Sequence, residues 1–282
     1  MHDYHLTLAG LHTLLRTPEE ITISENLAPF LCAPREAPDC TIVLKVCVQL
    51  PAASENGIWH GPEYYELRDG TSCIFHYDVN KQAAFAVTQI FENGNIEIAV
   101  LPPCLSYFSG STGIFNRIGL ETLLLQRQCL LLHASLIKYK GKTIALAGPS
   151  GVGKSTQANL WHAVLGAEIL NGDRAALRKA AGLWQAYGSP YAGTSGIYKN
   201  ESGPLAAIVL LSQTEENSLE RLSPREAFRQ LYPEFTVHHW DKAFVEKATD
   251  LCLQLLAEVP VYRLSCRPEE SAVTLLQKGL ML

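Results

Sequence analysis

Near the middle of the chain, the sequence reads Gly148-Pro149-Ser150-Gly151-Val152-Gly153-Lys154-Ser155. An apolar, β-prone segment precedes this stretch at 142–147, and a segment of helical character follows it at 156–165. The stretch fits the pattern G-x-x-x-x-G-K-[ST] in full, within the strand-loop-helix context that the pattern requires. It predicts a P-loop, or Walker A motif, whose glycines let backbone N–H groups surround an anion at a helix start. The alternative is a glycine-rich turn at an ordinary strand-to-helix junction.

The residue types in this stretch predict where ATP and Mg²⁺ would bind. Lys154 would reach the β- and γ-phosphates, and the Ser155 hydroxyl would ligate Mg²⁺. Nineteen residues after Lys154, a predicted strand ends in Asp173, where a neighbouring strand would present a second Mg²⁺ ligand. The alternative for Asp173 is a turn former at a strand end. The predicted nucleotide-binding residues are Gly148, Pro149, Ser150, Gly151, Val152, Gly153, Lys154, Ser155 and Thr156.

A β-hairpin is predicted directly before the P-loop. The apolar segment 130–137 and the segment 142–147 flank a turn at Lys140-Gly141. With that turn, paired positions sum to 281, so His133 lies opposite Gly148. An antiparallel neighbour before the loop departs from a simple parallel sheet. His133 is therefore a candidate site residue, and the alternative is a histidine that only packs beside the loop.

Length and composition exclude several classes of protein. A chain of 282 residues exceeds the usual size of one domain, so we expect two domains. The net charge of −5 offers no basic excess for binding nucleic acid. The eight cysteines form no C-x-x-C pair and indicate reduced thiols. We find no signal peptide, and no apolar run approaches the roughly 20 residues of a membrane span. These features predict a cytoplasmic protein without nucleic-acid or membrane partners.

Residues 1–110 are predicted to form a small, mainly antiparallel β domain. Turn signals at Asn56-Gly57, Asp69-Gly70 and Asn93-Gly94 separate short β-prone runs. The histidines of this region show no metal-ligand spacing. The expected strands are His5–Leu8, Ile21–Ile23, Thr41–Gln49, Tyr64–Leu67, Ser72–Tyr77, Ala84–Ile90 and Ile96–Val100.

Residues 111–282 are predicted to form an α/β domain. Apolar spacing predicts a helix over 114–128 at its start. Later elements are a hairpin over 176–187, a buried strand at 205–211, a helix capped by Ser223, a helix over 240–258, a strand at 261–265 and a helix over 269–278. The glycine- and hydroxyl-rich loop 188–201 either faces a substrate or is an ordinary surface loop.

Several of these stretches together resemble the HPr kinase/phosphorylase superfamily, over about residues 130–282. The resemblance is to HPr-kinase-like bacterial proteins with a His-Ala-Ser segment upstream of the P-loop, some of them associated with peptide modification. It is carried by Leu132-His133-Ala134-Ser135, Gly148–Ser155, Gly172-Asp173-Arg174, Gly203–Leu210 and Val261-Tyr262-Arg263-Leu264.

The resemblance implies a mixed-sheet P-loop kinase domain of the HPr-kinase/PEP-carboxykinase type. Such a domain transfers a phosphoryl group to a serine hydroxyl, and the resemblance also hints at a homo-oligomer. The family's pair of acids at the strand end is reduced here to Gly172-Asp173, and Asp173 would keep the role of proton acceptor. The family's glutamate- and arginine-containing signature before Gly-Leu-Gly is not legible in 189–198, so neither HPr as substrate nor the reverse dephosphorylation is implied.

The combined prediction is an ATP- and Mg²⁺-dependent phosphotransferase that modifies a hydroxyl, most simply a serine of a peptide or protein. Lys154 would hold the phosphates, Ser155 and Asp173 the Mg²⁺, and His133 would orient Asp173 or neutralise developing charge. Two alternatives stay open. One is a kinase of a free small molecule, and the other is a non-catalytic module that senses ATP.

Overall fold

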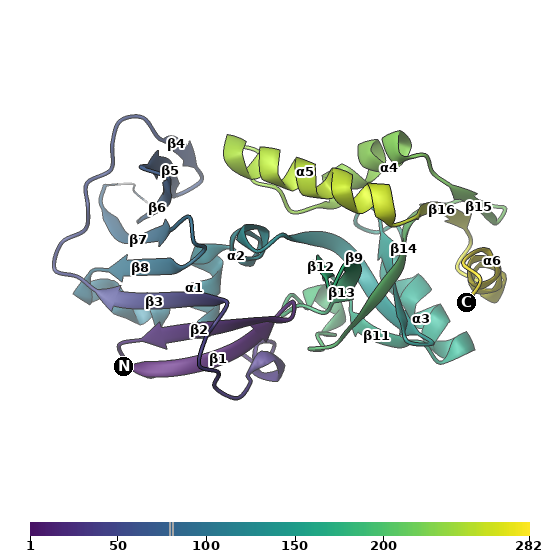
Figure 1. The fold of residues 1–282 in the computed structure, drawn as a ribbon, viewed down its shortest axis with the longest axis horizontal. Helices are drawn as coiled ribbons and strands as arrows, with labels where there is room; N and C mark the ends of the chain where they lie inside the picture. Colours follow the sequence, from purple (N-terminus) through teal and green to yellow (C-terminus); the bar gives the residue numbers. More distant parts are fainter. Residues whose placement is uncertain (79, 81) are drawn as a thin grey trace. The chain divides into compact units, whose positions relative to one another are not determined.

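The computed structural model describes residues 1–78, 80 and 82–282. The chain divides into two compact units, Met1–Arg127 and Gln128–Leu282 (Figure 1). Each unit is built on an eight-stranded mixed sheet, which confirms the predicted α/β class. The domain boundary was expected at residue 110, whereas the structure groups residues 111–127 with the N-terminal unit.

The N-terminal sheet has the strand order β1-β2-β3-β8-β7-β6-β5-β4 (Figure 1). The β2–β3 and β3–β8 pairs are parallel, and the other pairs are antiparallel. Its strands are β1 (His2–Leu8), β2 (Leu11–Thr17), β3 (Cys40–Val46), β4 (Ile58–His60), β5 (Glu63–Arg68), β6 (Thr71–Tyr77), β7 (Ala84–Ile90) and β8 (Ile96–Val100).

One expected strand of this unit does not form, and one strand was missed. No strand forms at Ile21–Ile23, where Thr22 makes only an isolated bridge with Gly110. Strand β2 was not expected, because its residues are buried on both faces and therefore do not alternate between apolar and polar. Two 3₁₀ turns complete the connections, η1 (Ala28–Phe30) and η2 (Pro102–Phe108).

The helix expected over 114–128 is two short helices, α1 (Ser111–Ile118) and α2 (Leu120–Gln126). Gly119 separates them at a φ of 72°, a conformation that glycine adopts without the cost a side chain imposes. Ser111 ties this region to the N-terminal unit, because its hydroxyl accepts a hydrogen bond from the Ser24 N–H at 2.9 Å. These contacts explain why the boundary lies beyond α2.

In the C-terminal sheet, the pairings of β10, β9, β12, β13 and β14 close into a ring, and β16 and β15 extend it from β14. The β10–β14 and β14–β16 pairs are parallel. Strand β11 pairs with β9. The strands are β9 (Cys129–Tyr139), β10 (Lys142–Ala147), β11 (Glu168–Asn171), β12 (Arg174–Ala180), β13 (Leu183–Tyr187), β14 (Ser202–Gln213), β15 (Ser218–Arg221) and β16 (Val261–Cys266).

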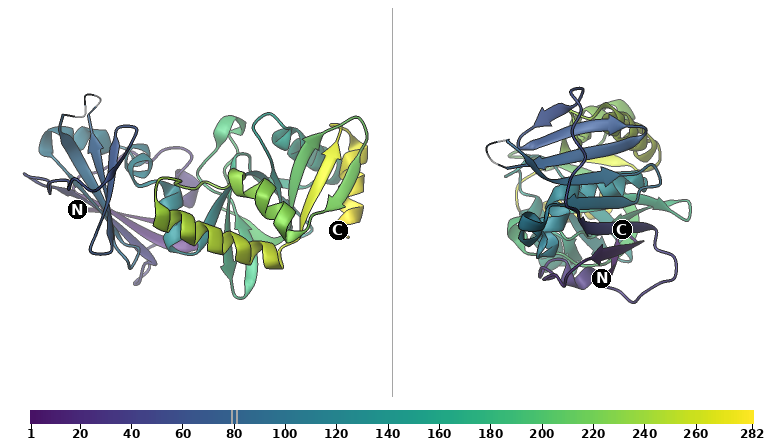
Figure 2. Two further views of the ribbon diagram at one scale, coloured as in Figure 1. Left: turned by 90° about the horizontal axis from the view of Figure 1, so that it is seen from above. Right: turned by 90° about the vertical axis from the view of Figure 1, so that its left-hand side faces the viewer.

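Four α-helices and two 3₁₀ turns complete the C-terminal unit. The predicted Ser223 cap is confirmed, with a full capping box to Glu226. Helix α6 lies beside β15 and β16 (Figure 2). The bounds are α3 (Lys154–Leu165), η3 (Gly193–Ser195), α4 (Pro224–Leu231), η4 (Tyr232–Glu234), α5 (Lys242–Glu258) and α6 (Glu270–Gly279).

The hairpin predicted before the glycine-rich stretch is confirmed. Tyr139 pairs with Lys142, and the turn residues Lys140 and Gly141 have φ values of 48° and 78°, as a two-residue primed turn requires. The predicted register holds up to the pair Ala147–Ala134, where β10 ends. His133 is therefore the next residue along β9, beside the point where the chain leaves the sheet.

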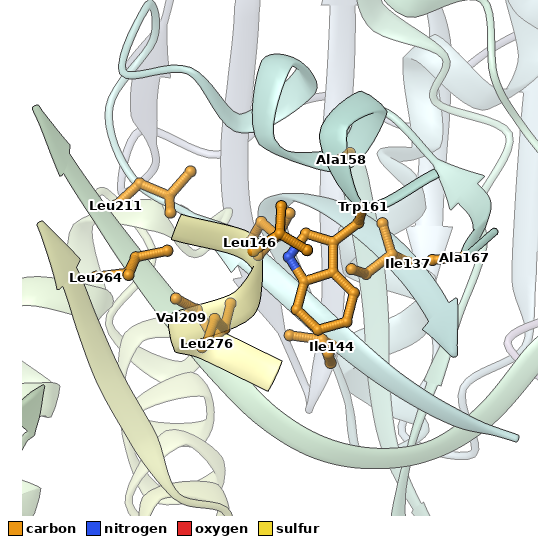
Figure 3. Close-up of a cluster of buried hydrophobic side chains, with 11 residues drawn as sticks. Ile137, Ile144, Leu146, Ala158, Trp161, Ala167, Val209, Leu211, Leu264 and Leu276 are labelled. Atoms are coloured by element: carbon orange, nitrogen blue, oxygen red, sulfur yellow. The ribbon is translucent and has the colours of Figure 1, made fainter. Parts of the chain in front are cut away.

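A core between the sheet and α3 fixes the helix that follows the glycine-rich stretch. Trp161 of α3 is fully buried, and Figure 3 shows its indole among apolar side chains of the sheet. The Tyr139 ring meets it edge-on, with centroids 5.7 Å apart. The buried members of this core are Ile137, Ile144, Leu146, Ala158, Trp161, Ala167, Val209, Leu211, Leu264, Val273 and Leu276.

All eight cysteines are free thiols in the structure. Within the described residues, no helix has both the length and the apolar character needed to span a bilayer.

Candidate functional site

The glycine-rich loop, residues 148–153, lies between β10 and α3, as its pattern predicts. Gly148 has a φ of 136°, and a Cβ there would lie 3.2 Å from Val152 Cγ1. Gly151 and Gly153 have φ values of 81° and 108°, and no heavy atom lies within 4 Å of their Cβ positions. The backbone at these glycines therefore adjoins open space at the start of a helix, an arrangement that suits an anion.

Lys154 is held inside this loop. Only 8% of the residue is exposed, and its Nζ donates hydrogen bonds to the carbonyl oxygens of Gly148 at 2.7 Å and Pro149 at 3.1 Å. Burial lowers the pKa of Lys154, whereas the carboxylates of Glu234 and Asp173 oppose that shift. The ammonium thus lies within electrostatic reach of two acids that are distant in sequence.

The two hydroxyl residues after Lys154 face solvent. Ser155 and Thr156 are exposed in the first turn of α3. Among the described residues, no group of three or more His, Cys, Asp or Glu side chains is arranged to hold a metal ion. A Mg²⁺ ion here would therefore depend on Ser155, a single acid and the phosphates of a nucleotide, which is a usual way of binding that ion.

His133 lies between two acids. Its Nε2 is 3.8 Å from Asp173 Oδ1, and its Nδ1 is 3.4 Å from Glu234 Oε2. Burial lowers the pKa of His133, with a further contribution from Lys154, while Asp173 and Glu234 act in the opposite direction. The histidine, the lysine and both acids form one electrostatically coupled cluster, which we call the His133 cluster.

Asp173 is positioned by Asn171, which is fully buried. The Asn171 Oδ1 accepts hydrogen bonds from the N–H groups of Asp173 at 2.8 Å and Arg174 at 2.7 Å. Its Nδ2 donates to the carbonyl oxygens of Ser189 at 2.9 Å and Tyr191 at 3.0 Å. This one side chain joins the end of β11 to the loop 188–201, and it was not identified from the sequence.

Arg174 contacts Asp173 and two residues from other segments of the chain. Its Nε lies 3.5 Å from Asp173 Oδ2, and its Nη1 donates to the hydroxyl of Thr236. The guanidinium also lies 5.3 Å from the centre of the Tyr191 ring. The sequence left open whether Arg174 contacts phosphate or pairs with Asp173, and the structure shows the pairing with Asp173.

Glu234 was also missed in the sequence. It ends the short turn η4, far along the chain from the other members, and no motif surrounds it. The following residues fix its place, because Phe235 bridges to Leu132 and the Thr236 N–H donates to the Leu131 carbonyl at 2.9 Å. Strand β9 therefore carries His133 and also binds the segment that contains Glu234. This pairing brings the two residues together.

The turn η3 packs closely against Gly172. A Cβ on Gly172 would lie 1.9 Å from Ser195 Oγ and 2.4 Å from Ser195 Cβ. Gly193 also lies close to Asp173, because a Cβ added to Gly193 would be 2.8 Å from the Asp173 Cβ. Residue 172 therefore has no room for a side chain, and the loop 188–201 packs directly over the Gly172-Asp173 peptide.

A cavity of about 330 Å³ adjoins the glycine-rich loop. Gln213, at the end of β14, donates from Nε2 to the carbonyl oxygens of Gly151 and Val152, both at 3.3 Å. Cys266 and Arg267, which follow from β16, form another wall. Its size is that of a small-molecule site, and it lies where the parallel strands β14 and β16 end.

Comparison with known families identifies the chain. The family described as SynChlorMet cassette protein ScmC matches residues 121–269, just over half of the chain. The chain belongs to the ScmC family. The matched ScmC region contains all members of the His133 cluster and the whole glycine-rich loop.

Comparison with curated proteins gave no match. Among solved structures, this ScmC-family chain is similar to an HPr(Ser) kinase/phosphatase from Coxiella burnetii, with a TM-score of 0.34 and 10% sequence identity. That similarity covers 54% of this chain and 96% of the other chain.

Proposed function

We propose that the C-terminal unit is an ATP-dependent phosphotransferase that moves the γ-phosphoryl group to a hydroxyl, as in a serine of a peptide or protein. The observation that carries this proposal is the His133 cluster, whose Lys154 is buried within a complete P-loop sequence. A phosphate-binding lysine, a fixed carboxylate and a neighbouring imidazole are the groups that hydroxyl phosphorylation uses.

The P-loop amides and Lys154 would hold the ATP phosphates. Lys154 would exchange its present bonds to the Gly148 and Pro149 carbonyls for bonds to phosphate oxygens. The cavity beside Gln213 and Arg267 would receive the nucleoside part. Mg²⁺ would be held by Ser155 and Asp173, and when bound it neutralises charge on the phosphates.

In the proposed step, the acceptor hydroxyl oxygen forms a bond to the γ-phosphorus as the bond to the β–γ bridging oxygen breaks. The hydroxyl proton passes to Asp173, and the products are a phosphate ester and ADP. His133, whose pKa is lowered by burial, would orient Asp173 from its position 3.8 Å away. Asn171 accepts a hydrogen bond from the backbone N–H of Asp173, and Arg174 lies beside the Asp173 carboxylate.

The test is transfer of label from γ-labelled ATP to a serine-containing acceptor in a cell extract. Lys154→Ala should abolish transfer, and Asp173→Asn should keep nucleotide binding but lose transfer. Lys142→Met, at an exposed lysine of β10, is a matched control that should keep full activity. Full transfer by Lys154→Ala, or wild-type turnover by Asp173→Asn, would exclude the assigned roles.

The same experiment separates the two alternatives. Label that migrates with small molecules in a size fractionation would identify a small-molecule kinase. Tight ATP binding without any labelled acceptor would identify an ATP-sensing module. The second alternative has one specific observation in its favour, because Ser195 fills the space that a second acid at position 172 would need.

A further inference from the structure

The N-terminal unit has a cavity of its own, with a volume of about 510 Å³. It lies at the ends of β5, β6 and β7, next to η2 and α1. The charged and aromatic side chains that line it are Glu63, His76, Tyr77, Asp78, Phe85, Tyr107 and Arg117. None of them belongs to the His133 cluster or to the ScmC-matched region.

Arg117 supplies the guanidinium of this cavity, and Glu63 acts on it electrostatically without forming a salt bridge with it. It is half-buried, and its guanidinium lies 4.8 Å from the centre of the Phe108 ring and 5.4 Å from that of Phe85. Its Nη1 donates to the Gly113 carbonyl at 2.8 Å. Among the described residues, no carboxylate oxygen lies within 4 Å of it, although a desolvated cation gains most from a paired anion.

The acid nearest to this arginine is already engaged. Glu63 Oε1 lies 3.0 Å from His76 Nδ1, and its Oε2 accepts a bond from the Tyr65 hydroxyl at 2.5 Å. The other ring nitrogen of His76 lies 2.9 Å from Thr88 Oγ1, and His76 is only 3% exposed. This chain of hydrogen bonds forms a polar wall and leaves for a ligand the Arg117 donors that are not bonded to Gly113.

The charges and walls define the class of ligand. Two carboxylates, those of Glu63 and Asp78, line the cavity with the Arg117 guanidinium, and the Asp78 Oδ1 accepts the N–H groups of Asn80 and Gln82, both at 3.1 Å. These acids repel a doubly charged phosphate more strongly than a monoanion. Tyr77, Phe85 and Tyr107 supply aromatic surface, and the volume matches small-molecule sites. We propose that this cavity binds the α-carboxylate of an aromatic amino acid, either free or at the C-terminus of a peptide, through Arg117.

The experiment is calorimetric titration of the full chain. The probes are N-acetyl-phenylalanine, its neutral amide, free phenylalanine and a hexapeptide ending in phenylalanine. The carboxylate should bind at least about tenfold more tightly than the amide, and Arg117→Gln should remove that difference. Tighter binding of the hexapeptide would assign a peptide terminus, and tighter binding of free phenylalanine would assign the amino acid.

Two further variants keep the test decisive. Arg16→Gln, at an exposed arginine paired with Asp3 in the same unit, is the matched control and should bind like the wild type. Tyr107→Ala removes a 55% exposed ring and should fold even if Arg117→Gln does not, yet it should weaken binding several-fold. Equal affinity for acid and amide, or no binding by any probe up to about 10 mM, would overturn the proposal.

Discussion

Asn171 holds Asp173 in place: its Oδ1 accepts the Asp173 N–H at 2.8 Å while its Nδ2 binds two carbonyls of the loop 188–201. The residue is fully buried, so these bonds have no competition from water. The backbone of the candidate proton acceptor is therefore tied both to the end of β11 and to the loop 188–201.

We expect Asn171→Leu to reduce phosphoryl transfer at least about tenfold while nucleotide affinity stays within about twofold, because it misplaces Asp173 without touching the P-loop. It should also destabilise the protein by about 1–3 kcal/mol, since buried N–H and C=O groups lose their partners. Asn171→Asp, which keeps the acceptor oxygen, should lose less activity. Transfer kinetics and urea unfolding check both effects, and unchanged turnover in Asn171→Leu would refute the positioning role.

The packing around residue 172 leaves no room for a side chain there. Gly172→Ala should destabilise the protein by about 1–3 kcal/mol, because its Cβ would overlap Ser195. Ser195→Gly removes the overlapping atoms, so the double variant should recover much of the loss. A double-mutant cycle by chemical unfolding measures this coupling, and the same cost for Gly172→Ala in both backgrounds would contradict it.

The apolar core under α3 supports the glycine-rich loop that precedes this helix. We expect Trp161→Ala to lower the free energy of unfolding by about 3–5 kcal/mol and Trp161→Phe by clearly less. Because the indole Nε1 has no hydrogen-bond partner among the described residues, the phenylalanine variant loses packing volume only. Thermal and urea unfolding measure the difference in unfolding free energy between the two variants. Equal losses in both variants would show that the indole is not the centre of this core.

The lowered pKa of His133 makes stability depend on pH. Because burial lowers the pKa of His133 in the folded protein below the ordinary histidine value of 6.5, the unfolded chain binds the proton more strongly. This contribution to stability is therefore present above about pH 6.5 and is lost as the pH falls through the folded pKa. His133→Gln should flatten the fall in unfolding free energy between pH 7.5 and about pH 5. His239→Gln, at an exposed histidine, is the control, and parallel curves for His133→Gln and wild type would disprove the linkage.

Much of the candidate site was predictable because local signals determine it. The Lys140-Gly141 turn set the hairpin register, and with it the place of His133 beside the loop. The glycines and Lys154 were recognisable from spacing alone.

Other parts of the structure had no local signal in the sequence. Glu234 reaches the site only through the bridge between Phe235 and Leu132, and β2 lacks alternation because both its faces are buried. The break at Gly119 lay inside an apolar spacing that suited one continuous helix.

The most direct test of the central claim is a comparison of α- and γ-labelled ATP, followed by acid hydrolysis and phosphoamino-acid analysis of the acceptor. The proposal predicts phosphoserine labelled from γ-labelled ATP alone, in the wild type and in Lys142→Met, and none in Lys154→Ala. Label from the α-position, or γ-label on serine that persists in Lys154→Ala, would contradict phosphoryl transfer at the P-loop.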